Sequence, residues 1–360
     1  MTKNREVKFW DTKFIETIKK LVPGTPLREG LENILMAKMG VLVLVDTNQP
    51  LVDVIDGGFV LNCEYTPAGF YELGKMDGAL IISADAKLIL YANAQLVPDS
   101  SISTTETGTR HRTAERVAKQ TGGLVIAISQ RRNLITMYLG NLKYTLKDIS
   151  VILSRANQAL QALGRYRKVL EKSLTNLNAL EFEDLVTLLD VTKIIIRVEQ
   201  VDRIAREIGL NVIELGSEGR LVSMQMAELM SEHDDMELLI KDYCTSKDHT
   251  IQEQVREQLA ALSEENLQPY TISRILGFNT TPNVLDIPVV PRGYRVIRRI
   301  PRLPMSVVEN LVNHFKTLHA IYNATIAELH QVDGISEGRA KTIKDGLKRA
   351  REKAVLEHHD

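Results

Sequence analysis

The sequence predicts an α/β domain with a mixed sheet, followed by an all-α helical spacer and a small all-α helix-hairpin-helix domain. In the first part of the chain, short apolar runs of strand length alternate with helical patterns. Apolar residues then recur every three or four positions, as on one face of a helix. From Pro291 the chain is basic, with 13 Lys and Arg against 8 Asp and Glu. We therefore expect three domains, over residues 1–147, 148–290 and 291–360.

The elements of the first domain follow from the apolar pattern and the turn residues. Val41–Val45 is a continuous apolar run, typical of a strand buried on both faces. Gln130–Asn133 is short enough to join two strands as a hairpin. The predicted helices cover 8–22, 27–39, 67–73 and 113–120, and the predicted strands cover 41–45, 59–61, 79–83, 88–91, 124–129 and 134–139.

Helical spacing dominates the second domain. The apolar residues of Ile152–Leu170 step by three or four positions and predict a long helix. A second helix is expected to begin at Asn178, where Glu181 completes a capping-box spacing, and to end before Gly209. The remaining predictions are an irregular stretch over 211–221 and helices over 224–242 and 252–262. Since no catalytic cluster stands out, we interpret this region as a spacer or an oligomer-forming segment.

Composition narrows the functional classes. With 44% hydrophobic and 25% charged residues, the sequence is typical of a soluble globular chain. The two cysteines, Cys63 and Cys244, are too few and too far apart for a disulfide framework or a structural zinc site, which favours a reducing cytoplasm. No signal peptide or membrane-spanning run is expected. The basic third domain indicates an anionic partner.

A phosphate-binding site is indicated at Thr107–Arg116. This stretch holds three arginines, one histidine and three threonines directly before a predicted helix. A helix N-terminus offers free backbone N–H groups and partial positive charge, and arginine forks match phosphate oxygens. The alternative is a solvated helix start with Thr109 or Thr113 as its N-cap.

A second motif, Asp77-Gly78-Ala79, runs directly into a predicted strand. The glycine would let a ligand approach the backbone, and the carboxylate could bind Mg²⁺ or Mn²⁺ or orient a hydroxyl group. Alone, an Asp-Gly pair is a common turn. Together with Arg110–Arg112 it fits a nucleotidyl-transfer site, with one carboxylate for metal and hydroxyl and several cations for polyphosphate.

A DNA-binding helix-hairpin-helix is predicted near the C-terminal end. Gly334 and Gly338 would allow a sharp turn and a close approach to phosphate. The amides of the following helix, with Arg339 and Lys341, would hold the duplex backbone, so that binding is independent of sequence and sensitive to salt. The alternative is an ordinary helical hairpin with a glycine turn.

The start of the third domain is rich in arginine. These residues are Arg292, Arg295, Arg298, Arg299 and Arg302. Leu303–Ser306 follows them and precedes a predicted helix over 307–318. We interpret it as a degenerate partner hairpin that lacks the glycines.

These motifs resemble those of a known family. Asp77-Gly78-Ala79 and Arg110-His111-Arg112 resemble the paired motifs of the diadenylate cyclase domain. With Asp56–Phe59, Gly108–Arg116 and the terminal hairpin, the resemblance to the DNA integrity scanning family spans essentially the whole chain. It implies condensation of two ATP into cyclic di-AMP, with release of two pyrophosphates, between facing protomers that each hold one ATP. It also implies an octamer of two facing rings, whose activity is lowered by branched DNA.

The resemblance implies residue roles as well. Asp77 would bind Mg²⁺ or Mn²⁺ and help to activate the 3′-hydroxyl group. Arg110, His111 and Arg112 would hold the phosphates. The other implied nucleotide contacts are Gly78, Ala79, Leu96, Thr109, Thr113 and Ser129.

Two further functional hypotheses stay open. One is a non-enzymatic DNA-binding scaffold that only senses ATP. The other is a DNA-end-processing nucleotidyltransferase, a class that usually clusters several carboxylates around two metals, whereas here only Asp77 is well placed. In each case we expect a cytoplasmic protein associated with the nucleoid.

Overall fold

The structure is a computed structural model that describes residues 12–45, 54–231, 235–279 and 283–358. The chain packs as two compact units. The first unit consists of Met1–Asn157 and Gly209–Met224, and the second of Gln158–Ile208 and Gln225–Asp360.

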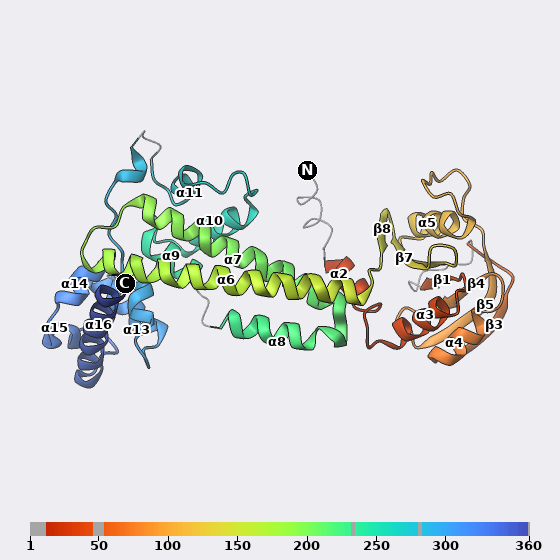
Figure 1. The fold of residues 1–360 in the computed structure, drawn as a ribbon, viewed down its shortest axis with the longest axis horizontal. Coiled ribbons are helices and arrows are strands. Elements are labelled where there is room, and N and C mark those ends of the chain that lie inside the picture. Colours follow the sequence, from red (N-terminus) through yellow and green to blue (C-terminus); the bar gives the residue numbers. More distant parts are fainter. Residues whose placement is uncertain (1–11, 46–53, 232–234, 280–282, 359–360) are drawn as a thin grey trace. The chain divides into compact units, whose positions relative to one another are not determined.

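The chain crosses between the two units three times, each time inside a helix (Figure 1). The three helices are α6 (Ile149–Phe182), α7 (Leu188–Leu215) and α8 (Arg220–Leu229). No loop segment therefore joins the units.

An eight-stranded sheet forms the centre of the first unit. Its order is β2-β5-β4-β1-β6-β7-β8, and β3 also pairs with β5. The pair β1–β4 is parallel and the other pairs are antiparallel, so the predicted mixed sheet is confirmed. The strands are β1 (Leu42–Val45), β2 (Ile55–Asp56), β3 (Phe59–Glu64), β4 (Ala79–Ile82), β5 (Leu88–Leu96), β6 (Leu124–Ser129), β7 (Leu134–Leu139) and β8 (Leu142–Thr145).

Helices cover both faces of this sheet (Figure 1). They are α2 (Thr12–Ile18), α3 (Pro26–Met36), α4 (Pro67–Leu73) and α5 (Thr109–Thr121). Phe14, Leu31 and Phe70 bring α2, α3 and α4 into one apolar core. Ala114 and Val117 bring α5 into a second core on the opposite face.

The sequence of β1 reflects this three-layer packing. Val43 and Val45 enter the core of α2, α3 and α4, whereas Leu42 and Leu44 enter the core of α5. Because both faces are buried, the strand is apolar throughout and shows no alternation with polar residues.

The second unit is helical. Besides its parts of α6, α7 and α8, it contains α9 (Asp235–Tyr243), α10 (His249–Ala261), α11 (Pro269–Ile275), α12 (Tyr294–Arg298), α13 (Met305–Phe315), α14 (Leu318–Asn323), α15 (Ile326–His330), α16 (Glu337–His358) and the 3₁₀ turn η3 (Val284–Asp286). Within the described ranges, no helix is long and apolar enough to cross a membrane.

The prediction that a helix begins at Asn178 is wrong. Helix α6 continues to Phe182, and α7 begins only at Leu188. Glu181 does not cap a helix, because its carboxylate is buried and accepts hydrogen bonds from Arg295 and Tyr243. A partner 114 positions away in sequence therefore overrides the local capping pattern.

Other element boundaries also differ from prediction. Residues 211–215 are helical, since α7 ends only before the 3₁₀ turn η2 (Gly216–Gly219). The predicted helix 224–242 is two helices, α8 and α9, and residues 232–234 between them lie outside the described ranges. Residues 8–11 of the first predicted helix are likewise outside those ranges. Helix α5 begins four residues before the predicted start, and β8 was not predicted.

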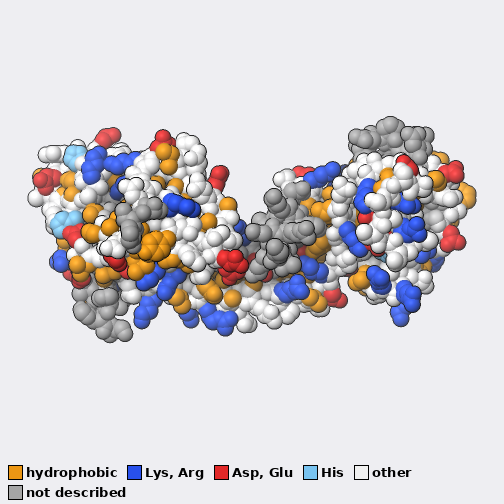
Figure 2. All heavy atoms as spheres, turned by 90° about the horizontal axis from the view of Figure 1, so that it is seen from above, with side chains coloured by type: hydrophobic (Ala, Val, Ile, Leu, Met, Phe, Trp, Pro, Cys, Tyr) orange, Lys and Arg blue, Asp and Glu red, His pale blue; other side chains and the backbone are white. Residues whose placement is uncertain are grey.

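Three of the five arginines that open the third predicted domain have partners within the second unit, although the Arg299 side chain is half exposed. Arg292 donates to the carbonyl oxygens of Lys241 and Cys244, both at 2.6 Å. Arg295 is fully buried, and Arg299 pairs with Asp235 at 3.4 Å. The basic composition of residues 291–360 therefore overstates the positive charge that is available to bind an anionic partner. On the face drawn in Figure 2, Lys and Arg are spread among acidic residues.

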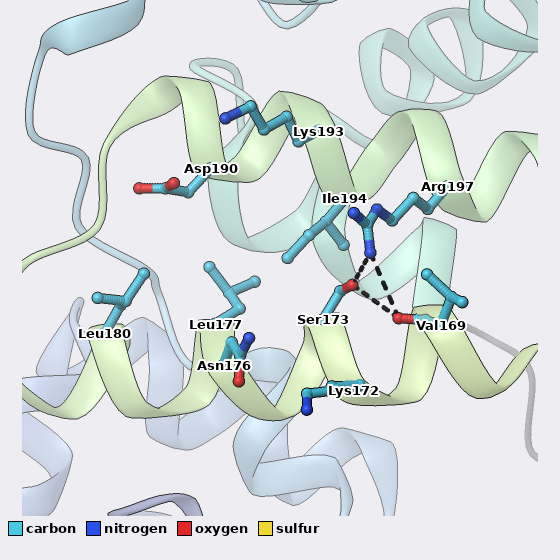
Figure 3. Close-up of a pocket in the computed structure, with 10 residues that line it drawn as sticks. All are labelled: Val169, Lys172, Ser173, Asn176, Leu177, Leu180, Asp190, Lys193, Ile194 and Arg197. Atoms are coloured by element: carbon cyan, nitrogen blue, oxygen red, sulfur yellow. Dashed lines mark hydrogen bonds between the residues drawn. The ribbon is translucent and has the colours of Figure 1, made fainter. Parts of the chain in front are cut away.

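Helices α6 and α7 line an open pocket of about 290 Å³ in the second unit (Figure 3). Arg197 of α7 reaches across it and donates from Nη1 to Ser173 Oγ and to the carbonyl oxygen of Val169. The floor contains Leu177 and Ile194, which are buried. The Arg197 contacts hold the two long helices together at this point.

Candidate functional site

The predicted site residues lie at one edge of the sheet in the first unit. Because β1 and β4 are parallel neighbours, Gly40 before β1 and Asp77–Gly78 before β4 lie at the same edge. Strands β5 and β6 run antiparallel to them, so Leu96 and Ser129 at their C-terminal ends lie there too. The fold thus brings together residues that are far apart in sequence.

The turn before β4 requires glycine. Gly78 has φ +92°, and a Cβ built on it would lie 2.9 Å from the carbonyl oxygen of Ala94. Asp77 precedes it and is exposed at this edge. Ala79 is buried and pairs with Ala94 in β5. The backbone turn therefore holds the Asp77 carboxylate in front of the strands.

Helix α5 presents its first turn without a side-chain cap. Its N-cap residue is Gly108, which offers no side-chain acceptor, so the alternative in which Thr109 or Thr113 caps the helix is wrong. Both threonines lie inside the helix, Thr109 exposed and Thr113 half-buried. The first amides of a helix have no intrahelical acceptor, so they remain available to an anion.

Arg110 and Arg112 both belong to this first turn and are exposed. A Cβ built on Gly40 would lie 2.7 Å from Arg110 Nη1, so the guanidinium group lies against the backbone before β1. Among the described residues, neither arginine forms an ion pair. Their positive charges are therefore not neutralised by the protein.

His111 faces inward and forms part of a hydrogen-bond chain. Its Nδ1 lies 2.9 Å from Tyr138 Oη, and Tyr138 donates to Glu106 Oε1 at 3.0 Å. Since the phenol proton goes to Glu106, we assign the proton of His111 to Nδ1, which leaves Nε2 as an acceptor. Lys143 pairs with the same carboxylate.

The electrostatics of this chain keep His111 neutral near pH 7. Burial lowers the pKa of His111, and Lys143, Arg132 and Arg110 act in the same direction against the opposing charge of Glu106. Burial and the Glu106 charge raise the pKa of Tyr138 well above its ordinary range. His111 therefore differs from Arg110 and Arg112, because it adds no permanent positive charge.

Ser129 ends β6 at the hairpin to β7. Its hydroxyl oxygen accepts from the backbone N–H of Arg132 at 3.2 Å. Leu96 is largely buried in the core beneath α5. The structure therefore places both residues at the same edge as Asp77, but it gives Ser129 a turn-forming role and Leu96 a packing role.

Several supporting residues were missed by the sequence analysis. Arg116 donates to the carbonyl oxygens of Ser100 and Ile102, both at 2.9 Å. Glu115 accepts from Thr104 at 2.5 Å. These contacts hold the loop before α5 in place. Glu115 and Arg116 lie within the basic motif itself, but their role as loop anchors cannot be read from spacing.

The metal-binding groups at this edge fit a metal ion that is bound partly by the protein and partly by the phosphates of a substrate. Mg²⁺ is usually bound through one or two carboxylates together with substrate phosphates. Asp77 supplies one exposed carboxylate, and no group of three or more His, Cys, Asp or Glu side chains converges in the described part of the chain. The residues therefore fit a shared protein–phosphate site and do not form a closed protein cage.

In the second unit, the predicted glycine hairpin lies between α15 and α16. Gly334 has φ +81°, whereas Gly338 lies in the first turn of α16. A Cβ on Gly338 would meet nothing within 4 Å, so the protein itself does not require glycine there. Arg339 donates to the carbonyl oxygen of Gly334 at 2.8 Å, and Lys341 is exposed.

A second hairpin repeats this geometry 32 positions earlier in the chain. Helices α12 and α13 begin 32 positions before α15 and α16. Arg302 has φ +64° where the later hairpin has Gly334. Buried residues recur at the same interval, at Ile300 and Val332, Leu303 and Ile335, Val308 and Ala340, and Leu311 and Ile343. The segment interpreted as a degenerate hairpin thus keeps the hairpin fold.

Two family models match the chain. The model described as "DisA bacterial checkpoint controller nucleotide-binding" covers residues 28–142, which include the Asp77 and Arg110 motifs. The model described as "DisA bacterial checkpoint controller linker region" covers residues 146–285.

Relatives match over nearly the full length. The DNA integrity scanning protein DisA of Carboxydothermus hydrogenoformans is 54% identical over 344 residues, covering 95% of this chain and 98% of the relative. The protein of the same name from Clostridium botulinum (strain Eklund 17B / Type B) is 54% identical over 347 residues, covering 96% and 97%. That of Clostridium tetani is 52% identical, covering 96% of each chain. The chain therefore belongs to the DisA family of DNA integrity scanning proteins, and it is a nucleotidyltransferase of the diadenylate cyclase type.

Proposed function

We propose that this protein condenses two ATP molecules into cyclic di-AMP at a site shared between two facing protomers. Each 3′-oxygen attacks the α-phosphorus of the opposite ATP and displaces pyrophosphate, so that two P–O bonds form, two break and two pyrophosphates leave. The sheet edge with Asp77 supports this proposal, because each chain offers one such edge and the reaction joins two nucleotides. The assembly that we propose is the octamer of two facing rings.

The residues of the edge suggest how the chemistry is divided. We assign the acceptance of the 3′-hydroxyl proton, or its orientation, to the exposed carboxylate of Asp77. Arg110, Arg112 and the free amides of α5 bind the phosphates and stabilise charge that develops on the leaving pyrophosphate. Mg²⁺ or Mn²⁺ at Asp77, when bound, would supply Lewis-acid charge to the phosphate oxygens.

Neutral His111 accepts a hydrogen bond at Nε2 and is oriented by Tyr138. We assign the remaining nucleotide contacts to Gly78, Ala79, Leu96, Thr109, Thr113 and Ser129. Gly78 and Ala79 contribute their backbone, since Ala79 has no exposed side chain.

The direct test is product formation from ATP with Mg²⁺ or Mn²⁺. The wild-type protein should form cyclic di-AMP, and Asp77→Asn should lower the rate by about 100-fold or more, as removal of a catalytic carboxylate does. Asp85→Asn, which alters another exposed aspartate of the same unit, is the matched control. ATP binding without turnover in the wild-type protein would favour the scaffold hypothesis.

We also propose that the two hairpins of the second unit bind branched DNA and that this binding lowers the cyclase activity. The protein would then work in the cytoplasm, in association with the nucleoid. Free amides at the start of α13 and α16, with Arg302, Arg339 and Lys341, would contact the phosphate backbones. The repeated hairpin geometry supports two such contacts. Loss of Lys341 by substitution with Ala should weaken binding to all DNA sequences alike and reduce the slope of log affinity against log salt by about one.

The functional division that we propose remains 1–147 for cyclisation, 148–290 for the spacer and 291–360 for DNA binding. Most of the spacer packs with the DNA-binding segment in the second unit, whereas residues 148–157 and 209–224 of the spacer belong to the first unit. Cutting the chain at Pro291 would therefore expose buried polar groups of α6 and α9, and point substitutions in the hairpins are the better test of DNA binding.

A further inference from the structure

A buried polar cluster in the second unit joins three helices. Arg295 on α12 is fully buried, and Glu181 on α6 is 1% exposed. Arg295 Nη2 donates to Glu181 Oε2 at 2.5 Å, and Tyr243 of α9 donates to Glu181 Oε1 at 2.5 Å. Arg295 Nη1 also donates to Asn178 Oδ1 of α6 at 2.6 Å. Both carboxylate oxygens of Glu181 are thus bound by residues of other helices.

A second buried carboxylate holds the start of α12. Asp242 of α9 is 2% exposed and accepts from the backbone N–H groups of Gly293, Tyr294 and Arg295 at 2.7, 2.7 and 3.1 Å. It therefore caps α12 from a different helix. Burial raises the pKa of Asp242 to about 6, with Glu181 acting in the same direction, whereas Arg295 and the N–H groups favour the ionised form.

A third carboxylate extends these contacts beyond the end of α12. Asp235 at the start of α9 lies 3.6 Å from Arg167 of α6 and 3.4 Å from Arg299. Helix α12 is thus fixed at its start by Asp242, through its body by Glu181 and just past its end by Asp235. All three carboxylates belong to α6 or α9.

Helix α12 also belongs to the hairpin module. Val296, Ile297 and Ile300 share one apolar core with residues of α13 and α16, such as Leu311 and Ile343. Phe182, the last residue of α6, packs against this core. The hairpins and the end of α6 therefore share both apolar and polar packing.

Buried ion pairs contribute little net stability, because the cost of removing two charges from water offsets most of their attraction. That cost is offset only when the partners keep good hydrogen-bond geometry, so the helices that carry them can pack in very few ways. We propose that the Glu181–Arg295–Tyr243 cluster, with Asp242, locks the hairpin module onto α6, so that DNA binding displaces the module and α6 together. α6 is one of only three helices in which the chain passes to the unit that holds the nucleotide site. The inference rests on the proposed regulation of the cyclase by DNA, and it assigns the transmission of that signal to α6.

The test loosens the lock without removing its charges. Tyr243→Phe deletes one hydrogen bond to Glu181, and Arg295→Lys keeps the charge but loses the forked contact to Glu181 and Asn178. Arg298→Lys is the matched control, because it makes the same exchange at an exposed position of the same helix. Cyclic di-AMP formation is measured with and without saturating branched DNA, and DNA affinity is measured in parallel.

Basal cyclase rate and DNA affinity should stay close to wild type in all three variants. Inhibition by DNA should weaken at least about fivefold in Tyr243→Phe and Arg295→Lys. A factor of about five is the lower end of the usual range for coupling between two sites. Inhibition should remain unchanged in Arg298→Lys. Full inhibition in both lock variants would overturn this inference while leaving the proposed function intact. A wild-type cyclase that ignores DNA would instead refute the proposed regulation, and this inference with it.

Hydrogen exchange provides a second readout if a substitution weakens folding. In Tyr243→Phe, amide exchange should become faster in residues 176–182 and 293–297 together, because the lock couples the two segments. Faster exchange in only one segment, or in neither, would show that the cluster does not join them.

Discussion

The guanidinium group of Arg110 lies against Gly40, at the position that a side chain on residue 40 would occupy. A Cβ built on Gly40 would lie only 2.7 Å from Arg110 Nη1 and 3.3 Å from the carbonyl oxygen of Ile128. Gly40 precedes β1, the parallel neighbour of the strand that follows Asp77. The absence of a side chain at residue 40 therefore sets where a phosphate-binding cation sits relative to the Asp77 carboxylate.

Gly40→Ala should consequently move Arg110 and impair the cyclase. Misplacement of a positioned group by about 1 Å can lower a rate roughly 100-fold, so we expect a loss of about 10- to 100-fold in initial rate. The thermal midpoint should change little, since Arg110 is exposed and can move. Gly209→Ala is the control, because a Cβ there meets nothing within 4 Å. An unchanged rate in Gly40→Ala would contradict the assigned position of Arg110.

Gly78→Ala should reduce stability as well as activity. Its backbone has φ +92°, and the added Cβ would lie 2.9 Å from backbone atoms of Asn93 and Ala94. We expect a loss of about 1–3 kcal/mol in the free energy of unfolding, measured by urea titration. Gly57→Ala separates strain from collision, because Gly57 has φ +62° but open space around it. An equal loss of unfolding free energy in both variants would show that the backbone near Gly78 moves to make room for the Cβ, so that only the strain of positive φ remains.

His111 should make stability depend on pH in the acidic range. Its pKa is below the ordinary value of 6.5 in the folded chain, so below pH 6.5 the unfolded chain binds more protons. Stability should therefore rise with pH up to about 6.5, and above that this contribution should be constant. His111→Asn keeps a donor near the Nδ1 position and removes the titration. The free energy of unfolding of this variant should show a shallower slope, and an identical slope would exclude His111 as a cause.

The two hairpin glycines should respond differently to alanine. Gly338 is helical with open space beside it, so Gly338→Ala should preserve or raise stability by up to about 1 kcal/mol while weakening DNA binding. Gly334 has φ +81°, so Gly334→Ala should destabilise the turn by about 1 kcal/mol or more. Thermal unfolding and DNA titration of both variants check this. If Gly338→Ala binds DNA as the wild-type protein does, the first turn of α16 does not contact DNA closely.

Local patterns predicted much of the first unit. Helix α4 and strands β6 and β7 have the predicted bounds, because apolar runs and turn residues such as Thr66 and Pro67 determine them locally. The paired motifs were also expected to form one site, and the fold places Asp77 and Ser129 at the same edge of the sheet. Gly40 was not among the predicted site residues, since its closeness to Arg110 arises only when α5 packs against the sheet.

Long-range partners explain the errors in the second unit. The spacing of Asn178 and Glu181 resembles a capping box, but Arg295, more than a hundred positions away, takes the Glu181 carboxylate. The same contact removes Arg295 from the basic surface that composition suggested. The repeated hairpin was only partly recognised, because the αL position carries Arg302 in place of glycine.

The central claim is that two copies of the Asp77 edge must face each other to form cyclic di-AMP. The most direct measurement is the specific rate of cyclic di-AMP formation over a wide range of protein concentration, with the mass of the assembly followed in parallel. We predict that the specific rate falls on dilution as the assembly dissociates and that Asp77→Asn stays about 100-fold or more slower than the wild-type protein at every concentration. A monomer that forms cyclic di-AMP at an undiminished specific rate would contradict the account.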